Sequence, residues 1–180
     1  MGKIVLITGG ARSGKSQYAQ QMAEKVSGRR MFIATCPKLD KELEQRIKKH
    51  REARKHRGWQ TIEETIDLKG CIEKAREYDV ILVDCLTLWI NNLMYDEKKG
   101  ELSVDEERVE DLCHEVVGVA RRARGTVIFV TNEVGMGIVP DNEVARRYRD
   151  LLGRCNQVIA ASADEVILMV CSIPLSVKCS

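Results

Sequence analysis

The sequence contains few aromatic residues, few prolines and no long apolar run. Aromatic residues make up 4% of the 180 residues, and proline occurs three times. So few rings argue against a surface that binds single-stranded nucleic acid by stacking on its bases. A transmembrane helix needs about 20 consecutive apolar residues, and no stretch of the chain approaches that length. We therefore expect no membrane span and no nucleic-acid partner.

The sequence also lacks the pattern of a disulfide scaffold, a metal framework or a secretory leader. Its seven cysteines are odd in number and form no C-x-x-C pair, and the three histidines have no ligand-like spacing to any cysteine. Cys85, Cys155 and Cys171 lie in apolar patterns typical of strands or helices. Met1 leads directly into an apolar segment, so no signal peptide is expected. These features favour buried, reduced thiols in a cytoplasmic protein.

The most informative segment is a glycine-rich motif near the N-terminus. Gly9-Gly10-Ala11-Arg12-Ser13-Gly14-Lys15-Ser16 fits G-x-x-x-x-G-K-[ST], follows the apolar run Ile4–Ile7 and precedes an amphipathic segment over Gln17–Val26. In such a P-loop, backbone N–H groups and the helix N-terminus surround phosphate oxygens. Lys15 would reach the β- and γ-phosphates, and Ser16 would ligate Mg²⁺. The motif predicts binding of a nucleoside triphosphate.

Apolar segments typical of strands alternate with amphipathic segments along the whole chain. Strands are predicted over Lys3–Thr8, Met31–Thr35, Val80–Asp84, Thr126–Thr131 and Glu165–Cys171, with a short edge strand near Leu175–Lys178. Helices are predicted over Gln17–Val26, Lys41–Arg57, Leu68–Glu77, Leu86–Tyr95, Val104–Arg124 and Glu143–Ala161. For the fifth helix, Ser103 is the expected N-cap and Gly125 the expected stop. The alternation predicts one α/β domain over residues 1–180, a P-loop NTPase of RecA-like type whose mostly parallel sheet has helices on both faces.

Two further strand ends carry polar residues that suit the same crevice, since ligands bind at the carboxyl ends of strands in such sheets. Val80-Ile81-Leu82-Val83-Asp84 is a Walker B pattern, in which a carboxylate on a strand next to the P-loop strand holds Mg²⁺. A helix cap is the alternative interpretation of Asp84. The segment Thr131-Asn132-Glu133-Val134-Gly135-Met136-Gly137 follows another buried strand. It fits a substrate loop and a structural turn about equally well.

Positive charge is concentrated between Lys41 and Arg57, where eight Lys/Arg accompany three Glu, a net charge of +5. The whole chain carries +2, so the remainder sums to −3. In a helix, Arg46, His50, Arg54 and Arg57 would form one line. Like charges disfavour the protonated form of His50, which leaves an imidazole nitrogen available as a nucleophile. From the residues alone, a surface histidine on a basic helix is the simpler interpretation.

Taken together, these segments resemble the bifunctional adenosylcobinamide kinase / adenosylcobinamide-phosphate guanylyltransferase family of cobalamin biosynthesis. The resemblance runs nearly end to end. It rests on the P-loop, the Ile33-Ala34-Thr35 strand end, the Arg46-Ile47 and His50-Arg51 pairs, Trp59-x-Thr61-x-Glu63, Val83-Asp84-Cys85-Leu86-Thr87, Thr131–Pro140, and Gly153-x-x-Asn156-Gln157 leading to Ala163-Asp164-Glu165-Val166. The run Thr-Asn-Glu-Val-Gly-Met-Gly is its most specific part. One departure is Ser172, where a glycine would be more usual, and it affects an edge turn.

The resemblance implies two reactions. ATP or GTP would phosphorylate the hydroxyl of adenosylcobinamide, with charge stabilised by Lys15 and by Mg²⁺ on Ser16 and Asp84. His50 would then attack the α-phosphorus of GTP, and adenosylcobinamide-phosphate would take the GMP from it. The residues implied in nucleotide binding are Gly9, Gly10, Ala11, Arg12, Ser13, Gly14, Lys15, Ser16, Ala34, Thr35, Cys36, Arg51, Glu52, Ala53, Arg54, Glu63 and Asp84. Glu63 would recognise guanine, and a homotrimer is also implied.

Two other function classes remain open on the sequence alone. A small-molecule kinase with a P-loop would explain Lys15 and Asp84 but would leave the basic line around His50 without a role. A non-catalytic or RecA-like nucleotide switch would hydrolyse triphosphate in the absence of any corrinoid. A covalent nucleotide adduct would distinguish the transferase from the plain kinase, and hydrolysis without corrinoid would identify the switch.

Overall fold

A computed structural model describes residues 1–37, 52, 57–95 and 104–179 of the chain. Its centre is a seven-stranded sheet with the order β3-β2-β4-β5-β1-β6-β7. The strands are β1 (Lys3–Gly9), β2 (Arg30–Ala34), β3 (Trp59–Glu63), β4 (Val80–Asp84), β5 (Thr126–Val130), β6 (Glu165–Val170) and β7 (Ile173–Lys178). All pairings are parallel except that of β7 with β6. The predicted, mostly parallel sheet is confirmed.

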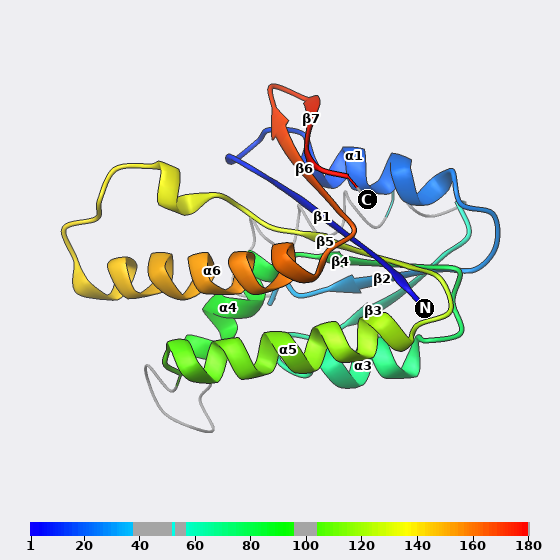
Figure 1. Ribbon diagram of the computed structural model, residues 1–180, viewed down its shortest axis with the longest axis horizontal. Coiled ribbons are helices and arrows are strands. Elements are labelled where there is room, and N and C mark those ends of the chain that lie inside the picture. The colour runs from blue at the N-terminus through cyan, green and yellow to red at the C-terminus, as the bar shows by residue number, and fades with distance from the viewer. Residues whose placement is uncertain (38–51, 53–56, 96–103, 180) are drawn as a thin grey trace.

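Helices cover both faces of this sheet, as the alternating pattern predicted (Figure 1). They are α1 (Lys15–Glu24), α3 (Leu68–Lys74), α4 (Leu86–Met94), α5 (Glu106–Arg122) and α6 (Glu143–Ser162), with a short 3-10 turn η1 at Val134–Met136. On one face α1 buries Ala19 and Ala23 against Val5 and Ile7 of the sheet. The other helices enclose a larger core on the opposite face, which includes Phe129.

The strand order corrects one expectation about the crevice. The sequence placed the strand of Asp84 next to the P-loop strand, but β5 lies between β4 and β1. In β5, Val127 pairs with Ile4 of β1 on one side and with Ile81 of β4 on the other. Because neighbouring strands lie about 4.8 Å apart, the ends of β1 and β4 are separated by two strand spacings. The crevice is therefore wider than the sequence suggested.

Four local expectations were wrong. The edge strand β3 was missed because its five residues are half-exposed and form no apolar run. The N-cap of α5 is Asp105, whose side chain accepts a hydrogen bond from the N–H of Arg108. The helix ends at Arg122, and Gly125 is needed for a different reason, because a Cβ there would lie 2.0 Å from the carbonyl oxygen of Asp79. Cys171 is exposed in a turn and is not a buried thiol.

Candidate nucleotide-binding site

The P-loop connects the end of β1 to the start of α1 and depends on two tightly packed glycines. Gly9 has φ +147°, and a Cβ there would lie 2.5 Å from the carbonyl oxygen of Met169 on β6. Gly14 has φ +92° and is the N-cap of α1. Between them, the N–H of Ser13 donates to the carbonyl of Gly10 at 3.3 Å and closes the loop. The sequence therefore forms the predicted strand–loop–helix, with α1 beginning at Lys15.

The Lys15 side chain folds back over this loop. Its Nζ donates to the carbonyl of Gly10 at 2.5 Å and approaches Ser13 Oγ at 3.4 Å, and only 8% of the residue is exposed. Burial lowers the pKa of the Lys15 ammonium from its ordinary value, and the nearby Cys85 and Asp84 act in the opposite direction. The loop thus holds a nearly buried cation at the N-terminus of a helix, the arrangement that attracts an anion.

The P-loop forms one wall of a cavity of about 610 Å³ at the carboxyl edge of the sheet. The other walls come from the ends of β2, β4 and β5 and from the first turn of α4. The lining residues are Ala11, Arg12, Ser13, Gly14, Lys15, Ser16, Gln17, Phe32, Ala34, Cys36, Asp84, Cys85, Thr87, Leu88, Val130 and Asn132. The cavity therefore brings together the phosphate motif, Asp84 and the amide of Asn132, which lie far apart in the sequence.

Thr35 was predicted to contact nucleotide, but the structure places it under the cavity floor. The residue is fully buried, and its hydroxyl donates to the carbonyl of Cys85 and accepts from the N–H of Cys85, both at 2.7 Å. Asn92 of α4 donates to the Thr35 carbonyl at 2.8 Å. These bonds hold the ends of β2 and β4 together, so that Ala34 and Cys36 face the cavity. Burial raises the pKa of Cys85 to about 12, so this thiol stays uncharged near neutral pH.

The segment after β5 lines the cavity and is also held by several hydrogen bonds. Asn132 lines the cavity, and its N–H donates to the Thr87 hydroxyl at 2.9 Å. Thr131 is fully buried, and its hydroxyl bonds Asn156 of α6 at 2.7 Å. The same Asn156 amide donates to the carbonyl of Asn132 at 3.0 Å. Asn132 is thus a site residue held by structural neighbours, of which Thr87 also lines the cavity.

Sequence reasoning considered Asn132 only as part of the possible substrate loop Thr131–Gly137, and it did not select Thr87 or Asn156 as site residues. A signal was present for two of them, because a polar residue directly after a buried central strand lies at the ligand-binding edge of a parallel sheet. Thr87 follows Asp84 by three residues and Asn132 follows Val130 by two. Asn156 carried no such signal, since it lies within α6 and reaches the segment only through the tertiary fold.

Of the remaining predicted site residues, the structure describes only Glu63 and Glu52. Glu63 ends the edge strand β3, opposite Ala34 in register, and its side chain is exposed. Glu52 is helical and exposed. His50, Arg51, Ala53 and Arg54 fall outside the described residues. Arg57, expected to extend their line, lies in a turn and pairs with Glu24 of α1 at 3.1 Å.

Two oxygen-bearing side chains of the cavity suit a magnesium ion. Ser16 and Asp84 both line it, and hydroxyl and carboxylate oxygens are ligands that Mg²⁺ accepts together with substrate phosphates. Within the part of the chain that the structure describes, no cluster of three His, Cys, Asp or Glu side chains forms a separate metal site. The donor set therefore fits an ion that is held jointly with a nucleotide.

None of the described helices is long and apolar enough to cross a bilayer.

Comparison with known sequences gives matches over nearly the whole chain. The profile of the family described as cobinamide kinase / cobinamide phosphate guanyltransferase matches residues 5–177. The Bifunctional adenosylcobalamin biosynthesis protein CobU of Escherichia coli K12 is 36% identical over 182 residues, which cover 97% of this chain and 99% of that protein. The CobU protein of Salmonella typhimurium LT2 is 38% identical, over 97% of this chain and 99% of that protein. The CobP protein of Pseudomonas aeruginosa is 37% identical over 96% of each chain.

Solved structures show likeness at the level of the fold. An ATPase of a bacterial type III secretion system superposes with a TM-score of 0.56 and 13% identity, over 93% of this chain and 51% of that chain. The ATP synthase subunit NeqB of Nanoarcheaum equitans superposes with a TM-score of 0.54 and 12% identity, over 93% of this chain and 45% of that chain. This chain thus spans about half the length of these two proteins. The likeness shows that the chain shares its α/β fold with these two proteins.

Proposed function

The chain belongs to the cobinamide kinase / cobinamide phosphate guanyltransferase family, and from this we propose that it is a bifunctional transferase of cobalamin biosynthesis. It phosphorylates adenosylcobinamide with ATP or GTP and then converts adenosylcobinamide-phosphate to adenosylcobinamide-GDP. The observation that carries the proposal is that Lys15, Ser16 and Asp84 line the same cavity. One phosphate-binding site then serves two transfers that both begin with a bound triphosphate.

In the kinase step, the hydroxyl oxygen of adenosylcobinamide attacks the γ-phosphorus of the triphosphate. The bond from the γ-phosphorus to the bridging oxygen breaks, the nucleoside diphosphate leaves, and the hydroxyl proton passes to solvent. The chain's task is to hold the phosphates in line and to stabilise their charge. The P-loop N–H groups and the Lys15 ammonium, almost buried beside the loop, supply that stabilisation.

Mg²⁺ fits this proposal through the oxygens of Ser16 and Asp84. When bound, it supplies positive charge that neutralises the phosphate oxygens. The position of Asp84 supports such a role, because the residue ends β4 at the cavity wall and α4 takes Cys85 as its N-cap. Because the N-cap position of α4 is taken by Cys85, the placement of Asp84 favours its interpretation as a metal ligand over that as a helix cap.

In the guanylyl step, a ring nitrogen of His50 attacks the α-phosphorus of GTP and pyrophosphate leaves. A phosphate oxygen of adenosylcobinamide-phosphate then attacks the same phosphorus, and the bond to His50 breaks. Arg51 and Arg54 would contact the nucleotide phosphates and Glu63 the guanine. Support for Glu63 is its place at the end of β3, beside Ala34 of the cavity. A carboxylate there suits the N1–H and amino group of guanine.

The decisive experiment is intact-mass analysis after incubation with GTP and Mg²⁺, followed by addition of adenosylcobinamide-phosphate. We expect a mass increase of one GMP per modified chain, and its discharge when the corrinoid phosphate is added. A separate assay follows conversion of adenosylcobinamide to its phosphate with ATP and with GTP. A protein that phosphorylates the corrinoid but never carries GMP would be a plain kinase. Fast triphosphate hydrolysis without corrinoid would identify a nucleotide switch.

A homo-oligomer, with the trimer favoured by family resemblance, and a cytoplasmic location complete the proposal. Support for assembly comes from exposed apolar side chains, with Met136 and Ile138 78% and 95% exposed after β5 and Ile173 68% exposed on β7. Exposed apolar groups of this kind are typical of surfaces that another chain covers. Support for the location is the free state of all seven cysteines. Native mass spectrometry measures the subunit number directly.

A further inference from the structure

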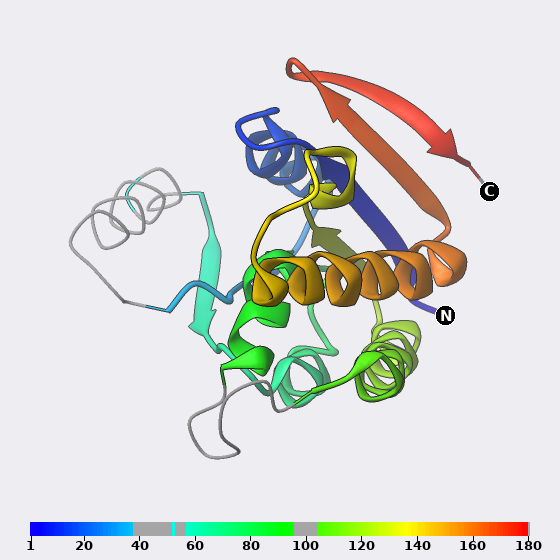
Figure 2. The same cartoon turned by 90° about the vertical axis from the view of Figure 1, so that its left-hand side faces the viewer.

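The turn between β6 and β7 lies directly against the P-loop. Figure 2 shows this hairpin rising beside the loop that leads into α1. The backbone N–H of Ser172, in the turn, donates to the carbonyl oxygen of Ser13 at 2.9 Å. The contact joins residues 159 positions apart, one in the phosphate motif and the other eight residues from the end of the sequence.

The P-loop and the turn pack so closely at this contact that a side chain at position 14 would collide with Ser172. A Cβ at Gly14 would lie 2.7 Å from Ser172 Oγ and 3.1 Å from Ser172 Cα. Gly14 therefore serves two purposes, since its positive φ forms the N-cap of α1 and its missing side chain admits the turn. A glycine in the P-loop motif is thus required here by a neighbour as well as by the phosphate.

The turn itself has an unfavourable backbone conformation for its residues. Cys171 and Ser172 have φ of +51° and +67°, the left-handed region that residues other than glycine rarely adopt. Two such residues in succession make the tight hairpin turn that normally contains glycine. The flanking pairs Met169–Pro174 and Val170–Ile173 hold the strands on either side. The hairpin therefore presents the N–H of Ser172 to the P-loop at a fixed position.

The geometry of a peptide unit connects this bond to phosphate binding. In a planar trans peptide, the C=O and the following N–H point in opposite directions. The carbonyl of Ser13 points to Ser172, so the N–H of Gly14 in the same peptide unit points away from Ser172. Ser13 and Gly14 both line the cavity. Backbone N–H groups with this orientation are what a P-loop offers to phosphate oxygens.

We propose that Ser172 is a positioning residue for the triphosphate: its backbone N–H fixes the Ser13–Gly14 peptide so that the Gly14 N–H is oriented for phosphate before nucleotide binds. The inference rests on the proposed binding of triphosphate to the P-loop. Because both transfers use that loop, loss of the bond weakens nucleotide binding in both. The departure at Ser172 noted in the sequence therefore lies beside the site, and not merely in an edge turn.

The test removes one hydrogen-bond donor and leaves the side chain in place. Cys171 is a natural junction for ligation, so a synthetic peptide of residues 171–180 can be joined to residues 1–170. In this peptide an ester replaces the amide between Cys171 and Ser172. We expect the dissociation constant for GTP with Mg²⁺ and the KM for triphosphate to rise about three- to tenfold, the usual effect of one hydrogen bond. The kcat should stay within about twofold, because the bond is present before and during the reaction.

Matched controls separate positioning from folding and from the proposed function. The ligated all-amide chain must bind GTP, and its failure to do so would contradict the proposed function itself. An ester at the Cys179 amide, beyond the end of β7, should bind GTP as the all-amide chain does. If the Ser172 ester binds GTP as tightly as that chain, the positioning role is wrong, whatever happens to the unfolding temperature.

Two recombinant variants test the same point without ligation. Ser172→Gly keeps the N–H and removes the strain of the positive φ, so its KM for triphosphate should stay within about twofold of the parent. Ser172→Val makes the positive φ much less favourable and should raise that KM in the same direction as the ester. Equal KM values for the valine and glycine variants would overturn the proposal.

Discussion

The hydroxyl of Thr8 donates a 2.7 Å hydrogen bond to the carboxylate of Glu133, and the backbone N–H of Glu133 donates to the carbonyl of Gly9 at 3.2 Å. The segment after β5 is thereby attached to the first residues of the P-loop. The Asn156 amide approaches the same carboxylate at 3.4 Å and extends the connection to α6. Asn132 is therefore held at the cavity by its neighbours on both sides.

Replacement of Glu133 by alanine should destabilise the fold. Thr8 is only 6% exposed, so Glu133→Ala leaves its hydroxyl without its acceptor, at a cost of about 1–3 kcal/mol in the free energy of unfolding. The double variant Thr8→Val/Glu133→Ala should lose less than the sum of the single losses. Urea unfolding measures all three. Glu77→Ala, at an exposed glutamate, is the matched control and should change little. Additive losses would show that the pair is not coupled.

Lys15→Ala should abolish most triphosphate binding and both transfer activities, because one P-loop serves both. The Lys15 ammonium is the nearly buried cation at this loop. Isothermal titration with GTP and Mg²⁺, together with both transfer assays, checks the result. Lys25→Ala, at the exposed C-cap of the same helix, should behave like the parent. Near-normal kinase turnover in the Lys15 variant would refute the role of this loop.

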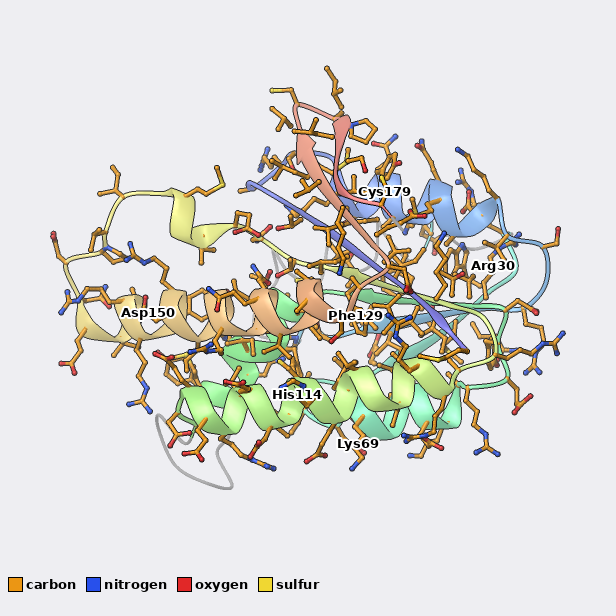
Figure 3. The ribbon with its side chains drawn as sticks, in the orientation of Figure 1. Arg30, Lys69, His114, Phe129, Asp150 and Cys179 are labelled. Carbon is orange, nitrogen blue, oxygen red and sulfur yellow. The ribbon has the colours of Figure 1, made fainter. Side chains whose placement is uncertain are left out.

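Asp84→Asn should keep the fold and lose Mg²⁺-dependent turnover. The residue ends β4 at the cavity wall and is no part of the buried core, so the unfolding temperature should barely change. Lost charge stabilisation should reduce kcat by about 10²- to 10³-fold. The dependence of rate on Mg²⁺ concentration is the measurement. Asp150→Asn, at an exposed position on α6 (Figure 3), is the control. An unchanged Mg²⁺ dependence in Asp84→Asn would restore its interpretation as a helix cap.

His50→Ala should prevent covalent labelling by GTP and should retain at least part of the kinase activity. The expected GMP–histidine bond is a phosphoramidate, which mild acid cleaves and base does not. His56→Ala and His114→Ala are the controls and should both be labelled. His114 lies on the exposed side of α5, 3.7 Å from Glu110 (Figure 3). If labelling persists in His50→Ala, the plain kinase becomes a better explanation than the guanylyltransferase.

The free energy of unfolding should decrease at acid pH because the Asp164 carboxylate becomes protonated. Its hydrogen bond with Arg121 lowers the pKa of the Asp164 carboxyl, and the N–H of Ile4 contributes further. The stabilisation is therefore complete above the ordinary carboxyl pKa of about 3.9 and is lost as pH falls through the lower folded value. Unfolding temperatures measured from about pH 2 to pH 6 should show a smaller pH dependence for Asp164→Asn than for the parent. If the unfolding temperatures of Asp164→Asn and the parent depend equally on pH, Asp164 is not the source of the acid sensitivity.

The sequence predicted those parts of the fold that local patterns determine. Val80–Asp84 was predicted with its observed bounds because four apolar residues end in an acid, and the P-loop was found because its glycines are a local requirement. The same kind of reasoning missed β3, which becomes a strand only by pairing with β2. It also placed β4 beside β1, since strand order is a property of the whole chain and leaves no trace in either segment.

The site was predictable where one residue type performs one task. Lys15, Ser16 and Asp84 were selected from their motifs and meet in one cavity. Thr35 was chosen as a ligand contact, yet its hydroxyl binds backbone beneath the floor. Asn156 and Ser172 act on the site from α6 and from the last hairpin. Their contribution depends on contacts that only the tertiary fold creates, and no spacing rule expresses such contacts.

The strand that carries the phosphate motif pairs with segments that come much later in the sequence. β1 pairs with β5 and β6, and the P-loop also receives its outer hydrogen bond from Ser172. All of these partners come from the final third of the given sequence, so they leave the ribosome long after the P-loop. The P-loop is therefore synthesised well before the strands and the hydrogen bond that hold it in place. Nucleotide can stabilise the fully supported loop only once β5, β6 and the turn at Ser172 have been added.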